Sequence, residues 1–191
     1  APAPLIISRA PLLVMDPTFE RNAVIAQLEK AIAPLAESIS QKLIPPTGAQ
    51  IGYAIRGARD NGGVAAVEGR ITGAGKPAGA CAFGADEEIA RVILTVMKFD
   101  PLRRSAAILR YSDRALDVLD GNLFLECASF NAARAPNGIN TMDWGIASCC
   151  REEVPDVIFT EDRSDKNAPL ILLGEEPVDV ANNIIICSNR I

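Results

Sequence analysis

The 191-residue sequence contains no histidine. This absence excludes Ser-His-Asp and Cys-His nucleophilic machinery, an imidazole acid–base catalyst, and every metal site that uses a histidine ligand. Acidic residues could still bind Mg²⁺, but the sequence has no DxD-type cluster that points to such a site. We therefore predict no metal site, and Mg²⁺ enters only if the protein is catalytic.

Long apolar runs are also missing, since no stretch approaches the roughly 18 residues that a membrane-spanning helix needs. The first residues lack the basic start and small-residue cleavage site of a signal peptide. The cysteines form an odd set without CxxC spacing, which favours reduced, partly buried thiols: Cys81, Cys127, Cys149, Cys150 and Cys187. We expect a soluble, cytoplasmic protein without membrane partners.

Basic residues are fewer than acidic residues. The chain has 19 Lys and Arg against 24 Asp and Glu, for a net charge of −5. An acidic chain is a poor sequence-independent binder of a polyanion, so this segment is not expected to bind nucleic acid directly.

The length fits one domain, which we place at residues 16–191 behind a proline-rich arm or linker at residues 1–15. A helix is predicted to start at Pro17, capped by Asp16. Pro34 falls inside its apolar stripe and should kink or divide the helix. The stripe itself recurs at spacings of three and four residues: Ile25, Leu28, Ile32, Leu35 and Ile39.

Strand-like and helix-like segments alternate over the rest of the chain. Two strands, 51–56 and 64–71, flank a turn that is rich in glycine. The later elements are predicted as helices at 86–98, 112–119, 144–150 and from 177 onward, and as strands at 106–111, 123–128, 157–159 and 170–173. This order predicts a three-layer α/β domain with a mostly parallel sheet, covered by helices on both faces.

The glycine-rich segment at residues 72–85 leads into a predicted helix, where Gly84 and Ala85 could offer backbone donors to a phosphate. However, Asp86, Glu87 and Glu88 occupy the first helical turn and would repel an anion placed there. The spacing matches neither the dinucleotide fingerprint nor the P-loop, so a flexible loop is the alternative.

A basic group surrounds the strand at 106–111: Lys98, Arg104 and Arg110, followed by Ser112. Arginine binds phosphate through two parallel N–H groups, and lysine supplies a point charge. The alternative is that the basic residues near 98–104 favour a helix C-terminus and solvent. That alternative explains Arg110 poorly, because a charge inside an apolar strand needs a partner.

Two further segments are candidates for ligand contact. Residues 140–145 include Thr141 and the only tryptophan, Trp144, whose ring could stack on a heteroaromatic ligand or pack against the core. The charged segment 161–167 contains Lys166 and is otherwise interpreted as a solvated loop. Composition and spacing alone predict an anion-binding α/β domain and nothing more specific.

Several segments, taken in order, resemble the ThiN thiamine-phosphate synthase family over roughly residues 20–187. The segments are 51–54, 64–71, 83–85, 89–101, 104–106, 110–112, 144–146 and 155–158. The resemblance implies a three-layer α/β fold, usually dimeric. It also implies a site for thiamine phosphate or for its pyrimidine pyrophosphate and thiazole phosphate precursors.

Within this resemblance, Arg104, Arg110 and Lys166 match basic positions of the family and could hold phosphate. Polar positions have changed elsewhere. Glu88 and Thr160 stand where the family commonly has histidine, Ile108 replaces an asparagine, Asn131 and Ala132 replace an Asp-Arg pair, and Asn167 and Ala168 replace a Glu-Pro pair.

The hydrophobic frame is thus retained while site positions differ, which predicts a binding domain without turnover. The family also supplies ligand-sensing domains behind helix-turn-helix segments of thiamine-pathway regulators, so we expect an effector domain of such a regulator. The alternative is an active synthase that joins the two precursors and releases pyrophosphate.

Overall fold

Helix α3 (Pro17–Ser38) is the first element of the computed structural model, which describes residues 16–191. The arm expected at residues 1–15 lies outside this range. Asp16 caps α3 as predicted, because its carboxylate accepts from the Thr18 N–H at 3.0 Å. Pro34 does not divide the helix, which continues to Ser38; it lies on the exposed side, opposite the buried Leu28 and Leu35.

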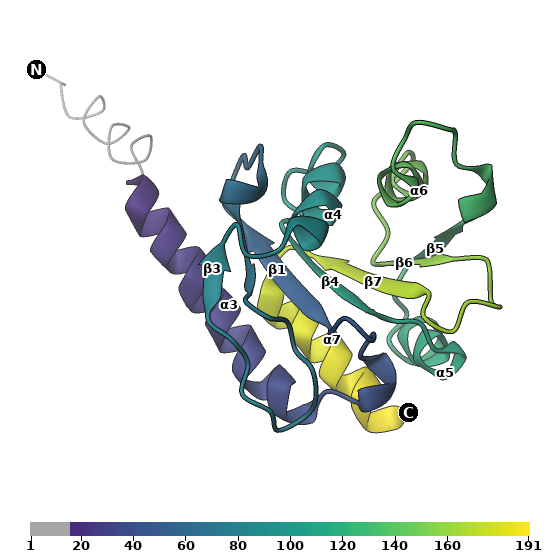
Figure 1. The fold of residues 1–191 in the computed structure, drawn as a ribbon, viewed down its shortest axis with the longest axis horizontal. Coiled ribbons are helices and arrows are strands. Elements are labelled where there is room, and N and C mark those ends of the chain that lie inside the picture. The colour runs from purple at the N-terminus through teal and green to yellow at the C-terminus, as the bar shows by residue number, and fades with distance from the viewer. Residues whose placement is uncertain (1–15) are drawn as a thin grey trace, which may run out of the picture.

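A seven-stranded sheet forms the centre of the molecule, in the order β3-β2-β1-β4-β7-β6-β5 (Figure 1). The strands are β1 (Gln50–Ala54), β2 (Val64–Val67), β3 (Cys81–Phe83), β4 (Ser105–Arg110), β5 (Cys127–Phe130), β6 (Val157–Thr160) and β7 (Pro169–Gly174).

The prediction of a mostly parallel sheet is wrong, because only β5 and β6 pair in parallel and every other neighbouring pair is antiparallel. A strand–helix–strand segment gives a parallel pair only when its two strands become neighbours. Here β3 and β4 flank a helix but are not adjacent, and β4 lies between β1 and β7, which both run opposite to it.

Helices cover both faces of the sheet. The long helices α3 and α7 (Pro177–Arg190) pack on one face, and α4 (Glu87–Met97) and α6 (Thr141–Cys149) pack on the other (Figure 1). The alternation of a β-strand divides β4 between these layers: Ala107 and Leu109 face α3 and α7, whereas Ala106 and Ile108 face α4 and α6.

Short helical turns complete the connections. They are η1 (Gln41–Leu43), η2 (Asn61–Gly63), α5 (Asp113–Asp117), the π-helical turn η3 (Val118–Asn122) and η4 (Ala132–Arg134). The strand predicted at 123–128 begins only at Cys127, because Leu123 continues the turn and Phe124 adopts a left-handed backbone with φ of 55°. Conversely, β3 lies inside the segment expected to be a glycine-rich loop.

None of the helices within residues 16–191 combines the length and the apolar character needed to cross a membrane.

Candidate functional site

The candidate site lies where β4, β5 and β6 finish and β1 and β7 begin, which we call the carboxyl end of the sheet. The antiparallel registers bring Gln50 opposite Ile108, and Pro169 opposite Arg110, at this end. The first turns of α4 and α6 reach the same end, and the Arg91 Nη2 contacts the Asp143 carboxylate at 2.6 Å to join the two helices. Loops and helix N-termini thus converge there, and helix N-termini offer backbone N–H groups and positive partial charge to an anionic ligand.

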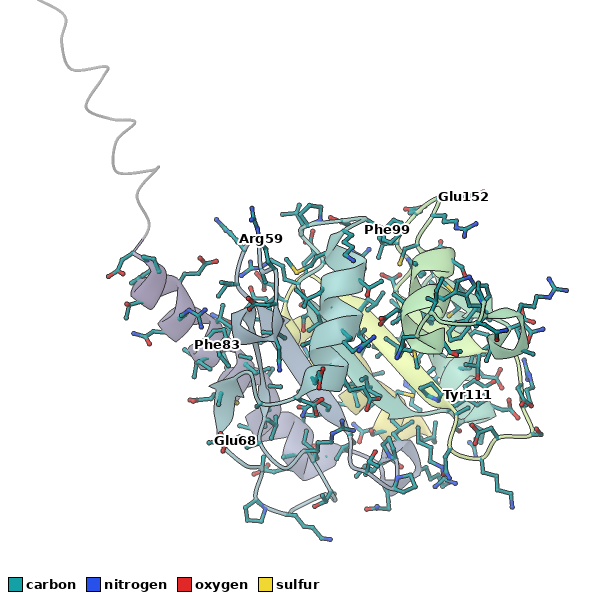
Figure 2. The ribbon with its side chains drawn as sticks, turned by 45° about the horizontal axis from the view of Figure 1, so that its top comes forward. Arg59, Glu68, Phe83, Phe99, Tyr111 and Glu152 are labelled. Carbon is teal, nitrogen blue, oxygen red and sulfur yellow. The ribbon has the colours of Figure 1, made fainter. Side chains whose placement is uncertain are left out.

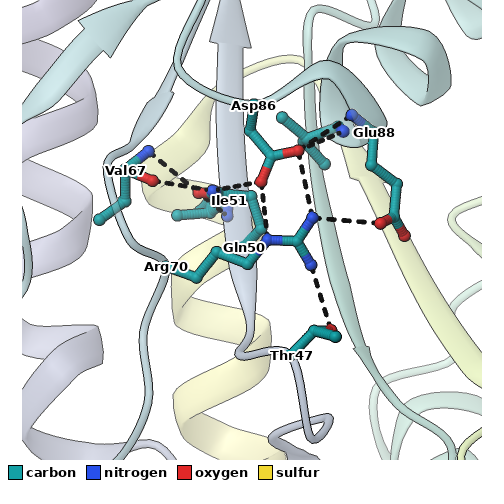
Figure 3. Close-up of polar contacts among 8 residues, drawn as sticks. Thr47, Gln50, Ile51, Val67, Arg70, Asp86 and Glu88 are labelled. Carbon is teal, nitrogen blue, oxygen red and sulfur yellow. Dashed lines mark hydrogen bonds and ion pairs between the residues drawn. The ribbon is translucent and has the colours of Figure 1, made fainter.

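A buried polar network connects β1, β2 and α4 at this end (Figure 3). Gln50 is 1% exposed, and its amide makes four hydrogen bonds. Its Oε1 accepts from the N–H groups of Ile51 and Val67, and its Nε2 donates to the Val67 carbonyl and to the Asp86 carboxylate at 2.8 Å. The Gln50 side chain thereby replaces the backbone hydrogen bonds that would continue the β1–β2 pairing at Val67.

The charged half of the network centres on Asp86 and Arg70. The Arg70 Nε donates to Asp86 at 2.8 Å, its Nη2 donates to Glu88 at 3.1 Å, and its Nη1 donates to the Thr47 hydroxyl at 3.3 Å. Arg70 has a left-handed backbone with φ of 61°, which residues with a side chain rarely adopt. This conformation directs the guanidinium back over the start of α4, as Figure 3 shows.

Asp86 also caps α4, since its Oδ1 accepts from the N–H groups of Glu88 and Ile89 at 2.9 and 3.3 Å. Burial opposes its ionisation, but hydrogen bonds from Gln50 and the Ile89 N–H, together with the Arg70 charge, hold the pKa of Asp86 below its usual value. The N-terminus of α4 therefore already holds an anion that belongs to the protein.

Gly84 and Ala85 precede this cap. Gly84 takes a φ of 75°, which suits glycine, and its N–H donates to the Val64 carbonyl at 3.1 Å. That N–H is therefore engaged in the sheet and does not point to a ligand.

The first turn of α6 borders an open cavity of ≈ 400 Å³. Its walls combine apolar groups, hydroxyls and carboxylates: Phe130, Ala132, Asn140, Thr141, Met142, Thr160, Asp162, Asp165 and Pro169. Thr141, predicted as a ligand contact, belongs to this lining. Trp144 instead packs its ring edge-on against Phe130, with ring centroids 6.3 Å apart. The tryptophan thus supports the cavity wall from behind.

Arg110, Ser112 and Lys166 also lie at the carboxyl end of the sheet. The Arg110 Nε donates to the Lys166 carbonyl at 2.9 Å, and Arg110 lines a second cavity of ≈ 270 Å³ beside the 41–48 segment. The Ser112 hydroxyl caps α5 by accepting from the Ala115 N–H at 3.3 Å. The Lys166 side chain is exposed.

Lys98 and Arg104 lie at the opposite end of the sheet, where α4 ends and β4 begins; Figure 2 shows Phe99 at this end and Tyr111 at the other. Lys98 follows the last turn of α4. Arg104 stacks over the Tyr53 ring at 4.7 Å and donates to the Ala54 carbonyl at 3.0 Å. The structure therefore does not bring these two basic residues together with Arg110 and Lys166.

Asp86 and Glu88 of this network were noted in the sequence, but their partners Gln50 and Arg70 were not singled out as site residues. Gln50 stands at the head of an apolar strand, where a buried amide needs several partners, and that was the only local signal for it. Arg70 stands within a segment that resembles the family, although its role as partner of Asp86 depends on tertiary contact. Within residues 16–191 no group of three or more Cys, Asp or Glu side chains is arranged to hold a metal ion.

Comparison with known proteins adds independent findings. The family model described as "Thiamine-phosphate synthase ThiN" matches residues 27–186. The chain is 30% identical over 176 residues to the bifunctional thiamine biosynthesis protein ThiDN of Methanocaldococcus jannaschii, covering 88% of this chain and 42% of that protein. It is also 30% identical over 128 residues to the thiamine-phosphate synthase ThiN of Methanothermobacter thermautotrophicus, covering 62% of this chain and 67% of that protein.

Among solved structures, the fold is similar to the C-terminal domain of a phosphomethylpyrimidine kinase. The TM-score is 0.78 at 26% identity, covering 88% of this chain and 100% of that one. The chain thus spans less than half the length of ThiDN but the whole of this solved domain.

Proposed function

The chain belongs to the ThiN thiamine-phosphate synthase family, and from this premise we propose that it binds thiamine phosphate or a phosphorylated precursor without turning it over. Such a domain acts as a ligand sensor for a thiamine-pathway regulator. Family membership supports the thiamine-related function, and the residues at the carboxyl end of the sheet support the absence of turnover.

The proposal of binding without turnover rests on three positions near that end whose residues differ from those common in the family. Ile108 is 3% exposed within the apolar cluster under α4 and α6. The Glu88 carboxylate is occupied by Arg70 at 3.1 Å. Thr160 lines the cavity beside α6, and an aliphatic hydroxyl does not ionise near neutral pH. Ile108 and Thr160 supply no acid–base group, the Glu88 carboxylate is paired with Arg70, and none of the three supplies a positive charge.

Joining the two precursors requires a stabilised pyrophosphate leaving group and dipoles preorganised around a developing cation. The Arg70 guanidinium at the same end of the sheet is bound by Asp86, Glu88 and Thr47, so it is not free to hold a pyrophosphate leaving group. This internal neutralisation favours binding over catalysis.

The cavity beside α6 suits the ligand's ring system. Phe130, Met142 and Pro169 offer apolar walls, and Asp162 and Asp165 offer negative charge that complements a cationic thiazolium ring. A phosphate at the first turn of α6 would meet backbone N–H groups there, since the acid of that turn, Asp143, is paired with Arg91. Arg110 pairs with Pro169 of the cavity wall in the β4–β7 register, and its side chain lines the neighbouring cavity beside residues 41–48.

Calorimetry with thiamine phosphate tests the binding. We expect Arg110→Gln to weaken binding by about tenfold, the usual effect of losing one charge-assisted phosphate contact. Arg114→Gln is the matched control, because Arg114 is an exposed arginine on α5. No binding by the unaltered protein, or equal losses in both variants, would contradict the proposal.

A turnover assay separates the sensor from the alternative, an active thiamine-phosphate synthase, which the names of the two 30%-identical relatives favour. The protein is incubated with both precursors and Mg²⁺, and thiamine phosphate is measured. We expect less than one product per protein molecule, whereas multiple turnovers would establish the synthase.

A further inference from the structure

The outer edge of β5 is open for pairing. The strand is last in the sheet order and pairs with β6 alone among the strands of residues 16–191. The carbonyls of Glu126 and Phe130 accept from β6 and the segment after it, from Val157 and Glu161, at 3.0 and 2.9 Å. Because backbone groups alternate in direction along a strand, those of Cys127 and Ser129 point away from β6. An open edge of this kind is a template for another extended chain.

A cavity of ≈ 410 Å³ follows this strand along its length. One wall is formed by residues 126–129 of the β5 segment, and the other by the end of α6 and the loop that follows it, residues 148–155. The cavity therefore offers room for side chains of a segment that pairs with the open edge. It lies apart from the carboxyl end of the sheet, since it borders the last turn of α6 and not its first.

The rim of this cavity is acidic. It carries Glu126, Glu152 and Glu153 against a single Arg151; Figure 2 shows Glu152 at the outer surface. Acidic groups also surround the strand: burial raises the pKa of the Cys127 thiol to about 11, and Asp120, Asp156 and Glu126 add to that effect. A positively charged occupant is complementary to such a rim.

Phe124 stands just before the strand and is 83% exposed, with its backbone in the left-handed region. Only Leu125 separates it from Glu126 at the cavity wall. An exposed aromatic face there can stack on a guanidinium or ammonium group.

We propose that the open edge of β5 and its cavity bind an extended, basic segment of another polypeptide. The segment adds as one more strand through the backbone of Cys127 and Ser129, and its Arg or Lys side chains meet the acidic rim and Phe124. A second copy of this chain is a poorer occupant. Two-fold pairing of β5 with itself would bring the acidic rims of both copies together, and like charges across paired strands are destabilising.

The test uses a fluorescein-labelled peptide of alternating arginine and valine, with binding measured by fluorescence polarisation at low salt. We expect saturable binding that weakens as salt rises. Chemical shifts of the Cys127 and Ser129 amides should move in the same titration. A peptide of alternating glutamate and valine should not bind.

Ser129→Pro removes one outward N–H without touching the ladder to β6, and it should weaken binding by about tenfold or more. Ser129→Ala keeps that N–H and is the matched control, with binding within about twofold of the unaltered protein. Unchanged binding by Ser129→Pro, with its folded circular dichroism spectrum retained, would overturn the proposal.

If Ser129→Pro does not fold, strand addition can still be tested with the unaltered protein. An arginine–valine peptide with an N-methyl group on every residue keeps its charge but has no backbone N–H with which to pair along either edge. Equal binding of the methylated and parent peptides would show simple charge attraction and overturn strand addition. Self-association through β5 in sedimentation experiments, with the peptide unable to compete, would overturn it in favour of a second copy.

Discussion

The first turns of α4 and α6 lie on the same face of the sheet and at the same end, yet they are organised in opposite ways. At α4, the Asp86 carboxylate accepts the helix N–H groups and is held by Gln50 and Arg70. At α6, Asn140 caps one N–H by accepting from Asp143 at 3.0 Å, and the turn borders a cavity of ≈ 400 Å³. One helix start is closed by an internal anion and serves the fold, while the other remains accessible to a ligand.

Removing the Asp86 carboxylate should lower the stability of the protein more than any other change considered below. Asp86→Ala leaves Arg70 and the buried Gln50 without their acceptor and uncaps α4, so we expect the free energy of unfolding to fall by about 3 kcal/mol. Chemical denaturation measures the change. The control is Glu88→Ala at the half-exposed end of the same network, which should cost about 1 kcal/mol or less. Similar losses in both variants would contradict a closed, buried α4 start.

The second prediction concerns the packing of α6 against Phe130, which a larger residue at Gly145 would disturb. A Cβ at Gly145 would run into the Phe130 ring, which forms part of the cavity wall. We expect Gly145→Ala to lower the free energy of unfolding by about 2 kcal/mol, as overpacking does, and to weaken thiamine phosphate binding. Gly121→Ala is the control, since its Cβ would meet no atom within 4 Å. A neutral Gly145→Ala would show that the cavity wall adapts freely.

Protonation of Asp86 at low pH should destabilise the start of α4. The pKa of Asp86 is lowered in the folded protein, so its stabilising contribution is fully present above the ordinary aspartate pKa of about 4. The contribution is then lost as the pH falls through the lower folded value. Unfolding measured from pH 6 downward should therefore show a steeper loss of stability for the unaltered protein than for Asp86→Asn. Parallel curves would mean that Asp86 is not held as an anion.

The smallest effect is expected at the contact between the two helices. The Arg91–Asp143 pair is largely solvent-exposed, with side chains 45% and 32% exposed. Because exposed ion pairs contribute little, Arg91→Gln should leave the thermal unfolding midpoint within error of the unaltered protein. A clear shift would show that the two helix starts depend on each other, and the contrast between them would then be weaker.

Local features of the sequence predicted the elements well. Helix α4 (predicted 86–98, observed Glu87–Met97) and β4 (predicted 106–111, observed Ser105–Arg110) agree within one residue, because capping and hydrophobic periodicity act over a few residues. Strand direction was not predictable in this way. The opposite direction of β7 beside β4 depends on where β7 inserts in the sheet, which no local pattern of Pro169–Gly174 encodes.

The candidate site was predicted in part for the same reason. The acids at the start of α4 were expected to repel an anion placed there, and the Asp86 carboxylate indeed occupies that helix start. The partners of Asp86 come from Gln50 and Arg70, which lie 36 and 16 residues earlier in the chain. Such long-range hydrogen bonds follow from the fold and leave no spacing in the sequence. The grouping of Lys98 and Arg104 with Arg110 likewise ignored the length of β4, which separates them.

The side chain of Gln50 has a consequence for how this protein can be observed. The Val67 N–H donates to the Gln50 Oε1 at 3.0 Å and not to a backbone carbonyl. Its rate of deuterium exchange therefore reports on a side chain, whereas the neighbouring amides of β2 report on the opening of the sheet. A single backbone amide thus serves as a native sensor of whether the start of α4 is closed, without any label being introduced.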